Sequence, residues 1–230
     1  MGKRNKRQEK QREEQLIDIV EAKDTAQDYF TNNKGLILGV IALVVLIPAI
    51  FFIYKFAIQA PKEKQASTAI FKAEQQFARD SFALALENPG GGFESLLDII
   101  DNYNGTKTAN LAKLYAGISY LNLGRYDEAI DYLDSHSAAG DYSPIIKNGN
   151  LGDAYSEKGD MGQALSYYSK ATTVGSDALL TPYYLYKLGL LAQKEGDNSK
   201  ALNAFKKIKD VYADSEEAKK VDRLITMLSN

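Results

Sequence analysis

The sequence predicts an all-α protein with one N-terminal transmembrane helix followed by an α-solenoid of about three repeats with flanking helices. Two observations lead to this prediction. An uncharged apolar run from Leu36 to Tyr54 is long enough to cross a membrane. Beyond this run, a set of glycines and alanines recurs in three stretches of the chain, at intervals of 35 and 37 residues.

The composition narrows the function classes. The chain has 230 residues and a formal net charge of −2, which offers no general attraction for nucleic acid. Cysteine is absent, which excludes thiolate catalysis and cysteine-based zinc sites. The single histidine, His136, is expected to be a solvated loop residue rather than a ligand or a base. We therefore expect no metal, no cofactor, no small-molecule substrate and no enzymatic activity.

The apolar run predicts a membrane anchor at residues 35–58. About 20 helical residues cross the hydrocarbon core of a bilayer. Pro48 is tolerated inside a membrane-spanning helix, and Lys55 near its end can reach the lipid headgroups. The run exceeds the apolar core of a signal peptide, and residues 57–61 offer no small-x-small cleavage site, so we expect the anchor to remain uncleaved.

The basic residues around the span predict its orientation. Eight lysines and arginines precede it within residues 1–34, whereas the stretch after it offers Lys55, Lys62, Lys64 and Lys72. The positive-inside tendency places the N-terminus in the cytoplasm and residues 60–230 outside it. Residues 1–34 form a basic arm, with a helical pattern from about residue 13 to residue 30. This arm either docks on the membrane or a partner, or is a solvated extension that carries the topology charges.

Residues 59–109 are expected to form a leading helical hairpin. The pattern predicts one helix over residues 62–86, a loop at residues 88–92, and a second helix over residues 93–103. Phe93, Leu96, Leu97 and Ile100 are expected on the inward face of the second helix.

Self-comparison of the rest of the chain aligns residues 117–133, 152–168 and 189–205. We place the repeats at residues 110–143, 144–180 and 181–214, followed by a capping helix at residues 215–230. The residues expected to pack each repeat are Gly117, Tyr120, Gly124, Ala129, Gly152, Tyr155, Gly159, Ala164, Gly189, Gly196, Ala201 and Phe205.

The recurrence of each glycine and alanine in the three repeats has a steric explanation. Gly117 and its equivalents let the two helices of a hairpin approach closely, and Gly124 and its equivalents end the first helix where positive φ is needed. Ala129 and its equivalents lie where the second helix crosses the first. Ser143 and Thr181, each followed by proline, are expected to be N-caps of the first helices of repeats two and three.

This pattern of Gly, Tyr, Gly, Ala and aromatic residues resembles the tetratricopeptide repeat (TPR). The sequence departs from the repeat at Lys113, where an aromatic residue is usual, and at Ala192, where tyrosine is usual. The resemblance implies a concave protein-binding face lined by the first helices. By the repeat's groove offsets it consists of Leu111, Leu114, Ile118, Leu121, Asn122, Ile146, Asp153, Ser156, Glu157, Tyr183, Tyr186, Leu190 and Gln193.

The character of this face leaves two alternatives open. Its apolar and aromatic members suit the binding of a helix or an unfolded segment. The alternative is that the preceding helix at residues 62–86 covers Leu111, Leu114 and Ile118, which would then be ordinary core residues.

The whole layout resembles the YfgM-like family of membrane-anchored TPR proteins. Residues 104–112, NGTKTANLA, are similar to the segment that leads into the family's first repeat, and residues 60–64, APKEK, resemble versions from the Bacteroidetes. The resemblance implies an ancillary subunit of the SecYEG translocon that contacts periplasmic chaperones and exported chains. The alternatives are a structural assembly factor for an envelope or secretion complex, and a regulatory subunit that acts through the cytoplasmic arm.

Overall fold

The computed structural model describes residue 23, residues 25–27 and residues 29–229, and it divides into two units, Met1–Ile58 and Gln59–Asn230. Most of the predicted basic arm therefore lies outside the described residues. In the first unit, α2 runs from Lys34 to Ile53 and contains Pro48, and a π-helical turn, η1, follows at Tyr54–Gln59. No side chain of α2 is buried within the protein, and the helix is long and apolar enough to span a membrane.

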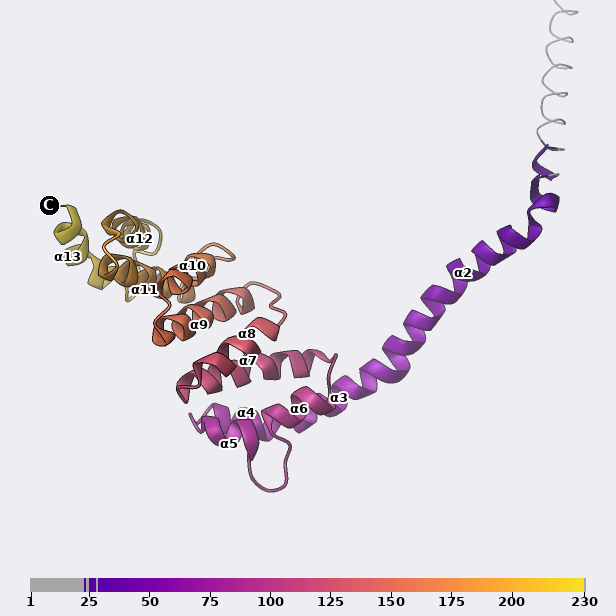
Figure 1. Cartoon of the computed structure of the whole chain (residues 1–230), viewed down its shortest axis with the longest axis horizontal. Coiled ribbons are helices and arrows are strands. Elements are labelled where there is room, and N and C mark those ends of the chain that lie inside the picture. The colour runs from indigo at the N-terminus through magenta and orange to yellow at the C-terminus, as the bar shows by residue number, and fades with distance from the viewer. Residues whose placement is uncertain (1–22, 24, 28, 230) are drawn as a thin grey trace, which may run out of the picture. The chain divides into compact units, whose positions relative to one another are not determined.

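The second unit is a succession of helical hairpins (Figure 1). Four short helices lead: α3 (Ala60–Ala69), α4 (Phe71–Phe77), α5 (Phe82–Glu87) and α6 (Leu96–Asn102). Three hairpins follow: α7 (Lys107–Asn122) with α8 (Tyr126–Ser135), α9 (Ser143–Lys158) with α10 (Met161–Ala171), and α11 (Leu180–Lys194) with α12 (Asn198–Val211). A final helix, α13 (Ala218–Ser229), packs against α12. The fold is thus the expected all-α solenoid.

The leading segment differs from its prediction in two places. The single helix expected over residues 62–86 is divided into α3, α4 and α5, with an interruption at Ile70 and a break at residues 78–81, where Asp80 has a φ of 56°. The break brings the ring of Phe77 to 4.6 Å from that of Tyr115 in α7 and to 5.6 Å from that of Phe82 in α5. The chain thus turns without a glycine or proline at residues 78–81, and the turn is accompanied by packing of Phe77 against both flanking helices.

The helix expected from residue 93 begins later, at Leu96. Ser95 caps it by accepting a hydrogen bond from the Asp98 N–H at 3.2 Å, and Asp98 in return accepts from the Ser95 N–H at 2.9 Å. Because Phe93 precedes the cap, its side chain is 57% exposed instead of inward, and Ile99 is fully buried in its place.

Close contact at glycine holds each hairpin together. A Cβ added to Gly117 would lie 2.6 Å from the Leu133 side chain, and one added to Gly189 would lie 2.4 Å from the Phe205 ring. A Cβ added to Gly152 would similarly lie 2.5 Å from the ring of Tyr168. Any side chain at these glycines would push the paired helices apart.

The structure also contains a glycine contact that sequence comparison did not find. A Cβ at Gly149 in α9 would lie 1.9 Å from Cζ of Tyr184 in α11. This contact joins neighbouring hairpins rather than the two helices of one hairpin. Gly149 has no equivalent glycine in the other repeats, which is why the repeat pattern does not reveal it.

The helix starts of the second and third repeats are not capped as expected. The helices α9 and α11 begin at Ser143 and Leu180, so Ser143 and Thr181 lie inside the first turn and the N-cap prediction is wrong. The Thr181 hydroxyl instead accepts a hydrogen bond from the Asp177 N–H at 2.9 Å, which closes the loop before the helix.

The carboxylate of Glu63 in α3 accepts hydrogen bonds from the free backbone N–H groups at the N-terminal end of α7. Its carboxylate accepts hydrogen bonds from the Lys107 N–H at 2.6 Å and from the N–H and hydroxyl of Thr108 at 3.0 and 2.6 Å. Free N–H groups at a helix start attract a carboxylate. Burial raises the pKa of Glu63, but the hydrogen bonds from Thr108 and Lys107 outweigh it, so the pKa lies below its usual value.

Two neighbours of Glu63 bind the loop before α7. Lys62 Nζ donates to the Asn104 carbonyl and Gln59 Nε2 donates to the Gly105 carbonyl, both at 3.1 Å. These contacts and the Glu63 carboxylate fasten α3 to the first repeat.

The prediction that His136 is solvated is wrong, because its side chain is buried between α7 and α9. His136 is 4% exposed, with Nδ1 at 2.7 Å from the Asn110 carbonyl and Nε2 at 2.7 Å from Ser143 Oγ. A carbonyl can only accept, so Nδ1 carries the proton and Nε2 accepts from the serine. Burial lowers the pKa of His136, and the nearby Lys147 and Lys113 lower it further.

We expect acidification to destabilise the fold through His136. Below about pH 6.5 the unfolded chain protonates this histidine more readily than the folded chain, in which the pKa of His136 is lowered, so stability decreases as the pH falls, by up to about 1.4 kcal/mol per pH unit. Urea unfolding of the full chain in detergent, between pH 7.5 and 5.5, measures this slope. The chain has one histidine, so a His136→Gln variant should be less stable at pH 7.5 yet show a flatter pH dependence. Equal slopes would contradict the assignment.

Candidate protein-binding groove

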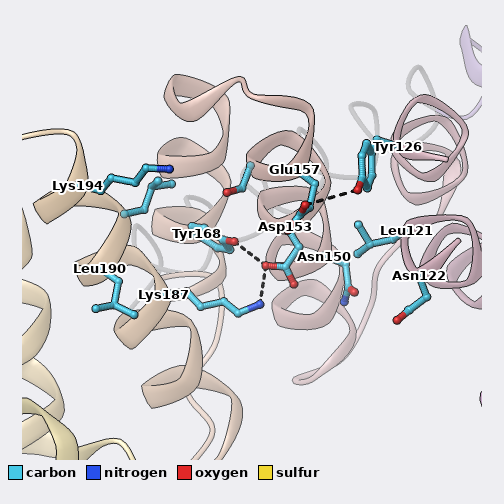
Figure 2. A pocket seen from close by; sticks show the side chains of 12 residues that line it. Leu121, Asn122, Tyr126, Asn150, Asp153, Glu157, Tyr168, Lys187, Leu190 and Lys194 are labelled. Atoms are coloured by element: carbon cyan, nitrogen blue, oxygen red, sulfur yellow. Dashed lines mark hydrogen bonds and ion pairs between the residues drawn. The ribbon is translucent and has the colours of Figure 1, made fainter. Parts of the chain in front are cut away.

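A groove of about 700 Å³ crosses the first helices of the three hairpins (Figure 2). These helices lie beside one another, α7 against α9 and α9 against α11. The groove is lined by Leu121, Asn122, Tyr126, Asn150, Asp153, Ser156, Glu157, Tyr168, Lys187, Leu190, Leu191 and Lys194. Most of this lining comes from the first helices, and Tyr126 of α8 and Tyr168 of α10 add to it from second helices.

The structure brings together part of the predicted face. Six of the predicted residues line the groove: Leu121, Asn122, Asp153, Ser156, Glu157 and Leu190. Tyr183, Tyr186 and Gln193 lie outside its lining. The ring of Tyr183 packs edge-on against Tyr184, and that of Tyr186 packs 6.1 Å from Phe205.

Four predicted apolar residues belong to the core instead. Leu114 is 6% exposed, and Leu111, Ile118 and Ile146 pack in part against the same cluster. This cluster includes residues of the leading helices, such as Ile70 and Leu86, because α5 and α6 pack on α7. The leading helices therefore pack on α7, the helix that carries Leu111, Leu114 and Ile118, and the groove that remains is more polar than expected.

One hydrogen-bonded network forms the floor of the groove. Asp153 Oδ1 accepts from the Tyr168 hydroxyl at 2.5 Å and from Lys187 Nζ at 2.7 Å (Figure 2). The carboxylate and the ammonium are both largely buried, with 20% and 29% of their side-chain surfaces exposed. Lys187 also lies 4.8 Å above the ring of Tyr183.

The network fixes the charges of its members. Burial and the adjacent Asp153 carboxylate raise the pKa of Tyr168, so its hydroxyl stays neutral and donates. Burial lowers the pKa of Lys187, but the charge and hydrogen bond of Asp153 more than offset this, and the pKa lies above its usual value. Asp153 and Lys187 therefore neutralise each other, and the network leaves no free charge on the floor.

Sequence reasoning missed half of the groove lining. The missed residues are Tyr126, Asn150, Tyr168, Lys187, Leu191 and Lys194. The repeat register contains a signal for two of them. Lys194 follows the predicted Glu157 by the same 37 residues that separate Gly152 and Gly189, so Glu157 points to Lys194. Lys187 follows Asn150 by the same 37 residues, so either residue would have pointed to the other once one of them was found. Tyr126 and Tyr168 come from second helices and are found only in three dimensions.

Comparison with known families agrees with the hairpins. Models of the tetratricopeptide repeat match residues 111–135, 148–174 and 183–215, one stretch in each of the three hairpins. A search of curated proteins finds no match to the chain. Repeats of this kind typically serve as non-enzymatic scaffolds for protein–protein interaction. The chain thus carries a tetratricopeptide-repeat solenoid, together with an N-terminal helix that could span a membrane.

Proposed function

We propose that this protein is a membrane-anchored scaffold whose groove binds segments of other polypeptides on the extracytoplasmic side. The observation that carries the proposal is the groove of about 700 Å³ across α7, α9 and α11, in a chain that also has a helix able to span a bilayer. A cleft of this size with both polar and apolar lining suits peptide recognition.

The distribution of basic residues supports this side of the membrane. Eight lysines and arginines precede the apolar run within residues 1–34, against four lysines in residues 55–72, and this excess favours a cytoplasmic N-terminus. The repeats then face the periplasm from the inner membrane. The protein has no cysteine, so a single introduced cysteine can be labelled without background.

The resemblance to the YfgM-like family supports a more specific role. We propose an ancillary subunit of the SecYEG translocon that passes emerging chains to periplasmic chaperones. A groove fixed to the membrane would meet exported segments as they leave the channel. This setting raises the effective concentration of the groove at the exit site.

Photocrosslinking from the groove tests this function in the full chain. A photoreactive residue at Asn122 or Leu190 is expected to trap translocon subunits together with many exported chains, identified by mass spectrometry after detergent extraction. The matched control is Ser166, which is exposed on the second helix α10, outside the groove lining. Equal capture from Ser166 would contradict groove binding, and one fixed partner would instead indicate an assembly factor.

Two further variants resolve the rest of the proposal. Cysteine at Ser229 should react with a membrane-impermeant maleimide applied from the periplasmic side, and protection there would overturn the orientation. A variant without residues 2–22 should capture the same partners, provided that Ser229 labelling shows unchanged topology. Loss of capture in that variant would favour a regulatory role of the arm.

A further inference from the structure

Three equivalent positions along the groove carry different charges. Asn122, Glu157 and Lys194 are separated by 35 and 37 residues, so each occupies the same place in the last turn of α7, α9 or α11. All three side chains are exposed and line the groove. Along the stack, the rim of the groove is therefore first neutral, then acidic, then basic.

The acidic and the basic rim residues are not neutralised within the described part of the chain. Glu157 accepts one long hydrogen bond from the Tyr126 hydroxyl at 3.5 Å and forms no ion pair there. Lys194 likewise forms no ion pair with a described carboxylate. Lys158, which follows Glu157 in the sequence, is paired with Asp127. Figure 2 shows Lys194 directed from α11 toward the space that Glu157 faces from α9.

The spacing of these charges fits an extended polypeptide. Packed helices lie about 8–10 Å apart. An extended chain in the polyproline II conformation rises about 3.1 Å per residue and has three residues per turn, so side chains three positions apart lie on one face and would meet α9 and α11. Asp153 and Lys187 are already paired below the rim, which leaves Glu157 and Lys194 as the charges that a bound segment meets.

We propose that the groove selects extended segments with one basic and one acidic residue about three positions apart. The basic residue lies beside Glu157 and the acidic residue beside Lys194, and the exposed Leu190 contacts an apolar residue between them. This selection rests on the proposed function of the groove and names the class of segment that it binds.

Four labelled peptides test the selection with the full chain in detergent. They share the frame GSLKALESG and carry Lys/Glu, Lys/Lys, Glu/Glu or Gln/Gln at the two charged positions. Fluorescence anisotropy is expected to show that the Lys/Glu peptide binds about fivefold more tightly than the others at low salt. The difference should shrink as the salt concentration rises, because the rim is exposed to solvent.

Reversing the charge of Glu157 or Lys194 tests the proposal even if a variant is less stable. A misfolded variant would lose peptide binding, whereas each folded variant is expected to prefer a different peptide. Glu157→Lys should prefer the Glu/Glu peptide, and Lys194→Glu should prefer the Lys/Lys peptide. The double variant should lose the preference for the Lys/Glu peptide and should prefer a fifth peptide, which carries the reversed order Glu/Lys in the same frame. The matched controls, Asp210→Lys and Lys206→Glu, reverse exposed charges on α12 outside the groove and should keep the wild-type preference.

The outcomes separate this inference from the function on which it rests. Equal affinity for all four peptides, or preferences that do not follow the reversals, would overturn charge selection and leave groove binding intact. Binding of none of the peptides, together with no crosslinks from Asn122 or Leu190, would overturn both.

Discussion

Replacing Phe205 with alanine is expected to lower the free energy of unfolding by about 3–5 kcal/mol. The ring is fully buried between α11 and α12, and it lies directly on the backbone of Gly189. Alanine would leave a cavity that the rigid glycine backbone cannot fill. Urea unfolding of the full chain in detergent, followed by far-UV circular dichroism, measures the loss. The matched control is Phe71→Ala, since Phe71 is 65% exposed and should change stability by about 0.5 kcal/mol or less.

A double-mutant cycle tests whether the ring and the glycine act together. Gly189→Ala alone should cost about 1–3 kcal/mol, because its Cβ would lie 2.4 Å from the Phe205 ring. In the Phe205→Ala background the same change should cost much less, since the ring is gone. Strictly additive effects would contradict the contact.

Gly149→Ala is expected to be the most disruptive single methyl addition between hairpins. The new Cβ would lie 1.9 Å from the ring of Tyr184, which is 5% exposed and has little room to move. We expect a loss of about 1–3 kcal/mol or more, measured by the same urea unfolding. The α9–α11 contact would open, so peptide binding in the adjacent groove should weaken as well.

Gly162→Ala is the matched control for this change. Gly162 lies in α10, and its added Cβ would meet no atom closer than Asp160 Oδ1 at 3.7 Å. Alanine there should stabilise the helix by about 0.5–1 kcal/mol, because it restricts the unfolded chain. A loss at Gly162 as large as that at Gly149 would show that helix propensity, rather than the Tyr184 contact, determines the effect.

The hairpins could be predicted from sequence because their causes are local and repeated. Gly124, Gly159 and Gly196 all adopt positive φ, with values of 74°, 89° and 82°, and each ends a first helix as the register predicts. A glycine that faces its own hairpin partner recurs in every repeat. Such features depend on residues at fixed offsets within about 20 positions, which a self-comparison detects.

The remaining features depend on residues far apart in the chain. The break at residues 78–81 accompanies a contact of Phe77 with the distant Tyr115, and buried His136 is hydrogen-bonded to Asn110 and Ser143 from two helices. The Asp153–Lys187 pair spans 34 positions. Hydrophobic periodicity carries no information on such pairs, so the groove's polar floor could not be predicted, although its rim lay in the repeat register.

The carboxylate of Glu63 has a practical consequence for any soluble version of the repeats. A truncated protein that begins after Glu63 would lack the carboxylate that accepts hydrogen bonds from two N–H groups and one hydroxyl in the first turn of α7. Water would then compete for that turn, and the first repeat would fray from its leading edge. Truncations designed for crystallisation or binding assays should therefore begin no later than Gln59. This start keeps the whole of α3 and the hydrogen bonds that Gln59 and Lys62 donate to the carbonyls of Gly105 and Asn104.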